Sequence, residues 1–302
     1  MKILLLGKDG QVGSWLRHSL APIGNILAFG RNELDLENLV GLQRRLTAAC
    51  PDIIVNAAAY TDVERAEIEP ARARAINCDA VAVMAQYAVQ NGAGLVHYST
   101  DYVFDGKKDT PYLEQDVPAP LNVYGATKRD GEIAIRSAQC HHLILRTSWI
   151  YSSNGTNFAR TILRLAHERE TLQVIDDQIG APTTARLVAD VTTDILMRLS
   201  HRDWPMDLDG TFHVTASGAT SWYGFARLLI EEGHRVGMKL RCWPEGITAV
   251  KTGEYKTAAE RPLNSRLSTE KMFRVFGVRL PLWTEDVCRT LSKLAEGTID
   301  ES

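Results

Sequence analysis

The sequence predicts a doubly wound α/β fold, in which helices cover both faces of a parallel sheet, followed by a smaller C-terminal substrate domain. Two observations carry this prediction. The 302 residues are 45% hydrophobic and 24% charged, the balance of a folded globular protein that can fill a substantial core. The first half of the chain alternates short, continuously apolar runs with longer helical patterns, as right-handed β–α–β units do.

Five apolar runs in the first half are expected to be strands. They are continuous rather than alternating, which is typical of strands buried on both faces of a parallel sheet. The runs are Lys2–Leu6, Asn25–Phe29, Asp52–Asn56, Gly94–Ser99 and His142–Tyr151. The helices expected between them are Gly13–Ala21, Leu36–Ala49, Asp62–Asn91 with an interruption at Pro70, and Tyr124–Ser137. We therefore assign residues 1–150 to the domain that contains the sheet.

The second half, residues 151–302, is less regular and predicts the smaller domain. Helices are expected at Asn157–Arg169, Ala185–Leu199, Ser221–Val236 and Thr284–Ala295, and strands at Gln173–Ile175 and Thr211–Thr215. The Pro- and Gly-bearing stretch Trp243–Asn264 is expected to be a loop. Segments within about 185–216 are expected to return to the main sheet.

Charge and apolar patterning exclude several kinds of partner. A formal net charge of −3 gives no basic surface of the kind that binds nucleic acid or an acidic membrane. The longest apolar stretches are about five residues, far below the eighteen or so that a membrane-spanning helix needs. Five scattered cysteines without a C-x-x-C motif are typical of reduced thiols in a cytoplasmic protein.

A glycine-rich turn opens the first predicted helix. Gly7, Gly10 and Gly13 have the spacing G-x-x-G-x-x-G directly after the first strand, and Gln11 and Val12 lie between the last two glycines. Glycines at such a turn let backbone N–H groups approach a pyrophosphate at the helix N-terminus. A plain strand-to-helix turn can also carry glycines, but at the start of a β–α–β series they favour dinucleotide binding.

The end of the second predicted strand bears on which dinucleotide binds. A carboxylate about 20 residues beyond the glycines would hold the ribose hydroxyls of NAD. Arg31 lies there instead and can pair with a 2′-phosphate, which favours NADPH and leaves NADH as the alternative. A solvated surface arginine is the other interpretation of Arg31. Asp35 and Leu36 follow and are expected to lie against the adenine.

Tyr124 and Lys128 are the candidate proton-transfer pair. Four residues along a helix place both side chains on one face, with about 6 Å of rise between them. An ammonium beside a phenol lowers the phenol pKa from its usual value of about 10, so the tyrosine can exchange a proton near neutral pH. The pair follows the strand that ends at Tyr98-Ser99-Thr100-Asp101, and strand ends and helix starts meet along the ligand crevice of such a sheet.

With these motifs, the sequence resembles the short-chain dehydrogenase/reductase superfamily, in its extended branch that modifies nucleotide sugars. The resemblance runs nearly end to end. It is carried by Gly7–Gly13, Asn56–Thr61, Asn77, Tyr98–Phe104, Pro120–Lys128, Arg146–Trp149, Asn157–Phe158, Asp177–Thr183 and Arg261–Ser265. It implies an NAD(P)-binding Rossmann fold and reduction of the C4 ketone of a dTDP-linked 6-deoxy sugar by NAD(P)H.

The resemblance also implies residue roles. Tyr124 would protonate the ketone oxygen, Thr100 would orient it, and Lys128 would hold the nicotinamide ribose. The remaining cofactor contacts are expected from Ala59, Tyr60, Thr61 and Tyr98. Substrate contacts are expected from Thr100, Asp101, Trp149, Asn157 and Arg261.

Three of these substrate residues have plainer interpretations. Trp149 could be a core residue, and Asp101 could cap a turn. Arg261 lies in a loop-like stretch because Pro262 fixes its own backbone and extends the residue before it. Its guanidinium suits a diphosphate, but it could instead pair with a surface carboxylate.

The family is often described as Mg²⁺-dependent, yet we expect no metal in this chain. Arg186 and Leu187 stand where a carboxylate would be sought, and no His, Cys or carboxylate cluster has metal-ligand spacing. The sequence is compatible with both a monomer and a homodimer.

The sequence is also compatible with two other functions. One is a dehydratase or epimerase of the same branch, although Thr100-Asp101 is followed by Tyr102 rather than by a second carboxylate. The other is a non-catalytic NADP-binding subunit that resembles the regulatory β subunit of methionine adenosyltransferase. Thr100, Tyr124 and Lys128 together favour a reductase.

Overall fold

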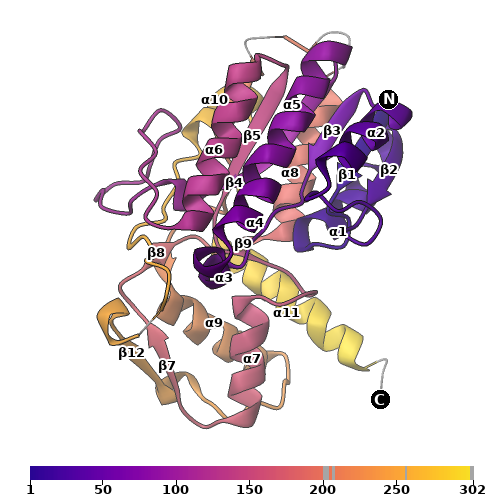
Figure 1. Cartoon of the computed structure of the whole chain (residues 1–302). Coiled ribbons are helices and arrows are strands. Elements are labelled where there is room, and N and C mark those ends of the chain that lie inside the picture. The colour runs from indigo at the N-terminus through magenta and orange to yellow at the C-terminus, as the bar shows by residue number, and fades with distance from the viewer. Residues whose placement is uncertain (200–203, 206–207, 256, 300–302) are drawn as a thin grey trace.

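The computed structural model, described at residues 1–199, 204–205, 208–255 and 257–299, has a central sheet of parallel strands (Figure 1). The strand order is β10-β5-β4-β3-β1-β2. The bounds are β1 Lys2–Leu6, β2 Asn25–Phe29, β3 Ile53–Asn56, β4 Gly94–Thr100, β5 His142–Thr147 and β10 Gly210–His213. Because the order proceeds outward from β1 in one direction and from β3 in the other, the doubly wound prediction is confirmed.

Two helical layers cover the sheet, and the apolar runs explain how both are packed. Ile3 and Leu5 of β1 belong to the core beneath α1 (Gln11–Ser19) and α8 (Ala185–Arg198). Leu4 and Leu6 belong to the opposite core, which is completed by α2 Leu39–Ala49, α5 Ala80–Asn91 and α6 Val123–Ala138. Successive strand residues face opposite sides, so a strand covered on both faces is continuously apolar.

The predicted helical region 62–91 is divided into several elements. α3 (Val63–Ile68) ends before Pro70, which opens α4 (Pro70–Arg74) because proline lacks the N–H that a helix interior needs. A π-helical turn, Ala75–Asp79, then leads into α5. This turn places Asn77 so that its Oδ1 accepts the Tyr60 N–H at 2.9 Å, which fixes the loop after β3.

The apolar run 142–151 is not one strand, contrary to the sequence prediction. β5 ends at Thr147, and Trp149 has a left-handed backbone with φ of 49°. This conformation breaks the extended backbone, so the following β6 (Ile150–Tyr151) pairs with β9 (Thr183–Thr184) rather than extending the central sheet.

Much of the second half packs around a core of its own. α7 (Phe158–Glu168), α9 (Trp222–Arg235) and α11 (Trp283–Ile299) contribute to it, together with β7 (Leu172–Ile175) and β12 (Ile247–Val250). β12 pairs in parallel with β7 inside the stretch predicted to be a loop, where the flanking Pro and Gly obscured a four-residue strand. α7, α9, β7 and β12 lie together below the main sheet in Figure 1. β8 (Ile179–Gly180) and β11 (Thr220–Ser221) form a further short pair.

Parts of the second half also pack on the main sheet. α8 packs against α1, and β10 pairs with β5. α10 (Glu270–Phe276) joins them, because Met272 and Phe276 lie in the same core as α1 and α8. The division of the chain at residue 150 stays a prediction. Among the described residues, no helix combines the length and apolar character needed to cross a membrane.

Candidate active site

A cavity of about 980 Å³ lies along the carboxyl ends of the central strands. Its wall includes residues at or just beyond the ends of five strands, β1 to β5. This is the edge where doubly wound sheets bind their ligands, and the volume is near the upper end for ligand pockets, about 1,000 Å³. The cavity is therefore large enough for a dinucleotide with a second ligand beside it.

Most of the residues predicted to form the site line this cavity. On the cofactor side they are Gly7, Gly10, Gln11, Val12, Arg31, Asp35, Leu36, Ala59, Thr61 and Tyr98. On the side of the expected chemistry they are Thr100, Asp101, Tyr124, Lys128, Trp149 and Asn157. Their shared position is observed, whereas their individual roles stay predictions.

The structure does not place Gly13 or Tyr60 in the wall of the cavity. A Cβ on Gly13 would lie 1.9 Å from the Gly7 carbonyl oxygen, so this glycine serves the close packing of helix against turn. The Tyr60 hydroxyl donates to Glu69 Oε2 at 2.9 Å, which turns the ring away from the cavity.

Arg261 also lies outside the wall. Its guanidinium forms an ion pair with Glu64 of α3, with 2.6 Å between Nη2 and Oε1, and it interacts with the Tyr102 hydroxyl. Tyr102 itself lines the cavity. The carboxylate partner that the sequence left as an alternative is therefore present, and a direct contact between Arg261 and substrate stays a prediction.

The glycine turn forms a cradle that fits a pyrophosphate. Gly7 has φ of 81°, and a Cβ there would lie 2.6 Å from the Ala58 nitrogen, so only glycine fits this close approach. Gly10 is the N-cap of α1 and has no side chain to cap the first helical N–H groups. Uncapped N–H groups at a helix start attract phosphate through hydrogen bonds and the helix dipole.

The adenosine end of the cavity has charged residues of both signs. The Arg31 side chain is 65% exposed, and its Nη2 lies 3.6 Å from Glu37 Oε1, a pair too exposed and loose to restrain it strongly. Sequence reasoning missed Asp9, which lines the cavity and lies so close to Gly30 that a Cβ there would be 1.8 Å from Asp9 Oδ2. The signal in the sequence was an acidic residue inside the glycine turn, whereas a carboxylate was expected only at the end of β2.

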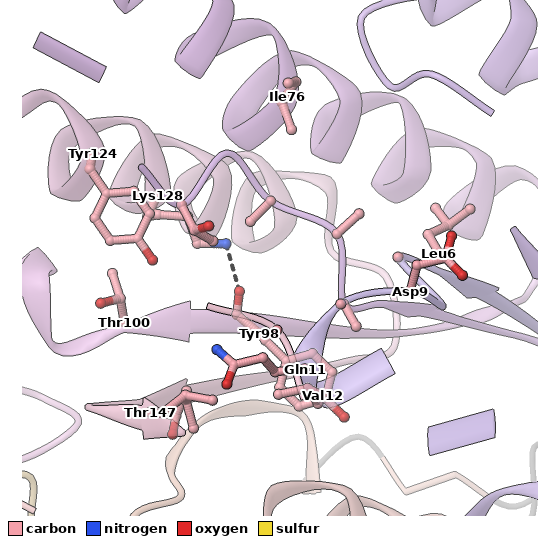
Figure 2. A pocket seen from close by; sticks show the side chains of 18 of the residues that line it. Leu6, Asp9, Gln11, Val12, Ile76, Tyr98, Thr100, Tyr124, Lys128 and Thr147 are labelled. Atoms are coloured by element: carbon pink, nitrogen blue, oxygen red, sulfur yellow. Dashed lines mark hydrogen bonds between the residues drawn. The ribbon is translucent and has the colours of Figure 1, made fainter. Parts of the chain in front are cut away.

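Thr100 and Tyr124 meet at the end of β4. Asn122 caps α6 by accepting the Gly125 N–H at 2.8 Å, and Tyr124 occupies the first turn. The Tyr124 phenol hydrogen-bonds with the Thr100 hydroxyl, and Figure 2 shows both side chains in the cavity. The Tyr102 ring packs edge-on against Tyr124, with 5.6 Å between the ring centroids. The proton donor is thus held between a hydroxyl and an aromatic edge.

Burial raises the pKa of Tyr124 to about 12, and the hydrogen bond from Thr100 only partly opposes this. The expectation that Lys128 lowers this pKa is wrong for the protein by itself. The Lys128 amine donates instead to the Tyr98 carbonyl oxygen at 2.6 Å, as Figure 2 shows. At neutral pH the phenol therefore keeps its proton, as a proton donor must.

Asp101 brings a buried carboxyl group next to the same two residues. Burial raises the pKa of Asp101 to about 6, against hydrogen bonds from the Ser265 and Thr100 hydroxyls. The Thr100 hydroxyl lies 3.1 Å from Asp101 Oδ1. Asp101 therefore links Thr100 to Ser265, which belongs to the C-terminal part of the chain.

Two stacked tryptophans close the opposite wall. The Trp149 and Trp222 rings are 3.5 Å apart between centroids and 9° from parallel, and both line the cavity beside Phe158. Trp222 was missed because a tryptophan at a helix start has no distinguishing pattern in the sequence. The Trp222 indole N–H donates to Gln178 Oε1 at 3.1 Å, which fixes the ring.

The residues do not fit the divalent metal that the family resemblance implies. Within the described part of the chain, no three His, Cys, Asp or Glu side chains are grouped closely enough to hold a metal ion. We therefore derive no step of the chemistry through a metal.

Comparison with known proteins agrees with this geometry. Residues 1–296 match the family model described as the RmlD substrate binding domain. The dTDP-4-dehydrorhamnose reductase of Escherichia coli (strain K12) is 48% identical over 298 residues, which cover 97% of this chain and 98% of that protein. The enzyme of the same name from Burkholderia thailandensis is 43% identical, with 94% of this chain and 95% of that protein covered.

A solved structure has the same fold over nearly the whole length. It is dTDP-4-dehydrorhamnose reductase from Bacillus anthracis in complex with NADP, 35% identical to this chain. The superposition has a TM-score of 0.86 and covers 97% of this chain and 99% of that one. The extent and identity of these matches show that the chain belongs to the RmlD substrate binding domain family.

Proposed function

We propose that this protein reduces the C4 ketone of dTDP-4-dehydro-6-deoxy-L-mannose (dTDP-4-dehydro-L-rhamnose), with NADPH as the reductant, and releases dTDP-L-rhamnose. The observation that carries the proposal is the meeting of Thr100, Tyr124 and Lys128 in one wall of a cavity that also contains the glycine turn. Relatives that are 48% and 43% identical over almost the whole chain have this activity in their names.

The proposed chemistry adds a hydride and a proton across one C=O bond. NADPH supplies the hydride to C4 of the sugar. Thr100 holds the ketone oxygen by a hydrogen bond, and Tyr124 donates its phenolic proton to that oxygen as the C–H bond forms. Lys128, which lines the cavity beside Tyr98, holds the nicotinamide ribose. Trp149 and Asp101 contact the sugar.

The cofactor side of the cavity supports NADPH over NADH. Arg31 is exposed at the wall and can turn toward a 2′-phosphate, and a solved relative is named as a complex with NADP. Asp9 brings a carboxylate to the same end, so the site has an acceptor for ribose hydroxyls as well. We expect NADPH to be preferred and NADH to be used more slowly.

Product identification tests the function directly. The protein is incubated with the 4-keto sugar nucleotide and NADPH, and the product is identified by NMR. Catalytic formation of dTDP-L-rhamnose is expected. A different C4 epimer would assign a related reductase, and cofactor binding without turnover would favour the regulatory-subunit alternative.

We also propose a cytoplasmic location and leave the monomer and the homodimer to be distinguished by light scattering. Support for the location comes from the cysteines, since all five are free thiols and Cys78, Cys140 and Cys242 are buried. Such cysteine usage is typical of a reducing compartment.

A further inference from the structure

A buried hydrogen-bonded chain ends at Lys128, and its other members have no role in the proposed chemistry. It runs from Asn56 at the end of β3, through His97 in β4, to Lys128 in α6, and these residues are 1%, 0% and 2% exposed. Asn56 Nδ2 lies 3.1 Å from His97 Nδ1, and His97 Nε2 lies 3.1 Å from Lys128 Nζ. Three buried polar side chains, from two neighbouring strands and a helix, are thus connected on this face of the sheet.

The chain is positioned by matched spacings in β4 and α6. His97 and Ser99 lie on the same face of β4, about 6.6 Å apart, and Lys128 and Glu132 are one helical turn apart, about 6 Å. His97 therefore meets Lys128 while the Ser99 hydroxyl donates to Glu132 Oε1 at 2.6 Å. Glu132 is in turn held by Arg146 of β5. The Ser99–Glu132 pair therefore fixes the register at which His97 meets Lys128.

The position of the proton on His97 follows from Asn56. Oδ1 of Asn56 accepts the Ala58 N–H at 3.2 Å, so the amide presents its NH₂ group to His97. Nδ1 of His97 must then be the unprotonated acceptor. Burial, with Lys128 nearby, lowers the pKa of His97 well below its ordinary value, so the ring is neutral and has one N–H. That N–H lies on Nε2 and points at Lys128.

This arrangement favours the uncharged form of the Lys128 side chain. An ammonium has three donors and no acceptor, so it would oppose the Nε2–H of His97 at 3.1 Å. An uncharged amine accepts the Nε2–H with its lone pair and still donates to the Tyr98 carbonyl oxygen at 2.6 Å. Independently, burial lowers the pKa of Lys128 to about 8, and Glu132 only partly opposes this.

We propose that Asn56 and His97 favour the uncharged amine of Lys128 before the cofactor binds, and that above neutral pH Lys128 therefore takes up a proton from water as NADPH binds. The inference rests on the proposed function, because it requires Lys128 to meet the nicotinamide ribose. Ribose hydroxyl oxygens can accept hydrogen bonds from an ammonium, whereas the Nε2–H of His97 cannot. The incoming proton joins the lone pair of Nζ, and at pH 8.5 most of the positive charge beside Tyr124 is therefore gained as the cofactor binds.

The neighbours of Lys128 that have a shifted pKa keep their charge state at pH 8.5. Burial holds the pKa values of Tyr98 and Tyr124 above their ordinary value and that of Asp101 near 6, while Arg146 holds that of Glu132 low. On the elements packed against α6, burial raises the pKa of Cys78 in the π-helical turn. Charged groups there also include Glu67 of α3, which caps α6, and Arg74, Asp79 and Asp130, which form ion pairs.

Calorimetry of NADPH binding in buffers of different ionisation enthalpy tests the proposal. If the Lys128 pKa rises from about 8 to the ordinary value of about 10.4, binding takes up about 0.7 proton at pH 8.5 and about 0.1 at pH 7. No uptake at pH 8.5 overturns the proposal.

Variants at position 97 distinguish the effect of His97 on the protonation of Lys128 from the effect of burial. In His97→Gln, the amide can turn its oxygen toward Lys128 and accept from an ammonium, so we expect proton uptake at pH 8.5 to fall by at least half while NADPH still binds. Unchanged uptake overturns the role of His97. The matched control is His142→Gln, at another buried strand histidine, whose Nδ1 bonds to the Cys140 carbonyl at 2.7 Å. The control should keep the wild-type uptake.

NMR of the histidine ring nitrogens tests the position of the His97 proton in the unsubstituted protein, so the test does not depend on whether a variant folds. The His97 ring is expected to show a protonated Nε2 and an unprotonated Nδ1, and a proton on Nδ1 overturns the proposal. A failure of this inference can be told apart from a failure of the proposed function. Ketone reduction without proton uptake contradicts only this inference, whereas proton-linked NADPH binding without reduction contradicts the function.

Discussion

At the residue scale, Tyr124 is the group whose removal should have the largest effect on the reaction. Tyr124→Phe keeps the ring that packs against Tyr102 and removes the proton that the ketone oxygen receives. General acid catalysis contributes about 10² to 10⁴-fold, so we expect kcat to fall by at least about 100-fold. Steady-state kinetics measures the loss, and calorimetry should show NADPH binding close to that of the unsubstituted protein.

The matched control for Tyr124→Phe is Tyr87→Phe, which removes the hydroxyl of another buried tyrosine, in α5 and outside the cavity wall. Its kcat should stay within a few-fold of the unsubstituted value. Retained activity in Tyr124→Phe would show that another group, with Asp101 the nearest candidate, protonates the oxygen.

Arg31 should decide the preference between the two nicotinamide cofactors. Its only described ion pair is a loose 3.6 Å contact with Glu37, so the guanidinium can reorient toward a 2′-phosphate at little cost. Arg31→Ala should weaken NADPH binding by about 1.5–3 kcal/mol, as for a hydrogen bond to a charged group, and leave NADH almost unchanged. Titrations of both cofactors measure this, with the exposed Arg44→Ala as the control. Equal losses for both cofactors would mean that Arg31 has a structural role.

At the element scale, the loop that contains Arg261 is tied to α3. Glu64 pairs with Arg261 and also accepts the Ala258 N–H at 2.6 Å. If the guanidinium turns to the substrate diphosphate, Arg261→Ala should raise KM for the sugar nucleotide about tenfold, equivalent to about 1.4 kcal/mol. Kinetics and a thermal melt together measure this effect.

Glu64→Gln is the companion variant for Arg261, because it removes the ion pair and keeps the guanidinium. Its KM should rise less than that of Arg261→Ala. A lower melting temperature in both variants, with KM unchanged in both, would assign Arg261 to the anchoring of the loop alone.

The strands of the main sheet were predictable because burial on both faces leaves a strong local signal. β1 and β2 have the predicted bounds, and β3 and β4 differ from them by one residue. The break after β5 was not predictable, because the positive φ of Trp149 is imposed by its tertiary setting rather than by its residue type. β12 was missed since its partner β7 is more than 70 residues away, and pairing between distant strands leaves no local periodicity.

The residues of the candidate site likewise differ in whether the sequence could predict them. Residues next to a strand end or a glycine turn, such as Gly7, Thr100 and Tyr124, were predicted to lie together and do so. Trp222 and His97 were missed, since each acts through a contact with a distant residue. Arg261 was placed near the substrate by its chemistry, but the sequence could not show that Glu64 would engage it.

At the scale of the whole molecule, the cavity joins the two halves of the chain. Gln11 Oε1, in the glycine turn, accepts hydrogen bonds from Ser152 Oγ at 3.1 Å and Asn157 Nδ2 at 3.0 Å. Asp101 and Asn122 likewise contact Ser265 and the Glu260 carbonyl. The cofactor cradle and the substrate wall are therefore held by shared hydrogen bonds, which restrains the distance between the two bound reactants.

His213 should make the stability of the whole fold depend on pH. It is fully buried in β10, its Nδ1 donates to the Ser268 carbonyl at 3.0 Å, and its backbone N–H donates to Glu114 Oε1 at 3.1 Å. It therefore connects three segments that are far apart in the sequence. Burial, with Arg146 nearby, lowers the pKa of His213 to about 3, so the folded protein holds this ring neutral.

The direction of the effect follows from proton binding. Below the unfolded-state pKa of about 6.5 the unfolded chain binds a proton at this histidine that the folded chain does not, so stability falls as pH falls toward 3. The contribution of His213 should decrease by about 2 kcal/mol between pH 8 and pH 5. His213→Asn keeps a donor for Ser268 and removes the titrating ring. Urea unfolding at both pH values should therefore show a smaller loss of stability in the variant than in the unsubstituted protein. Equal losses would mean that the ring is already protonated in the folded state, or that it titrates alike in both states, and would exclude His213 as a source of acid sensitivity.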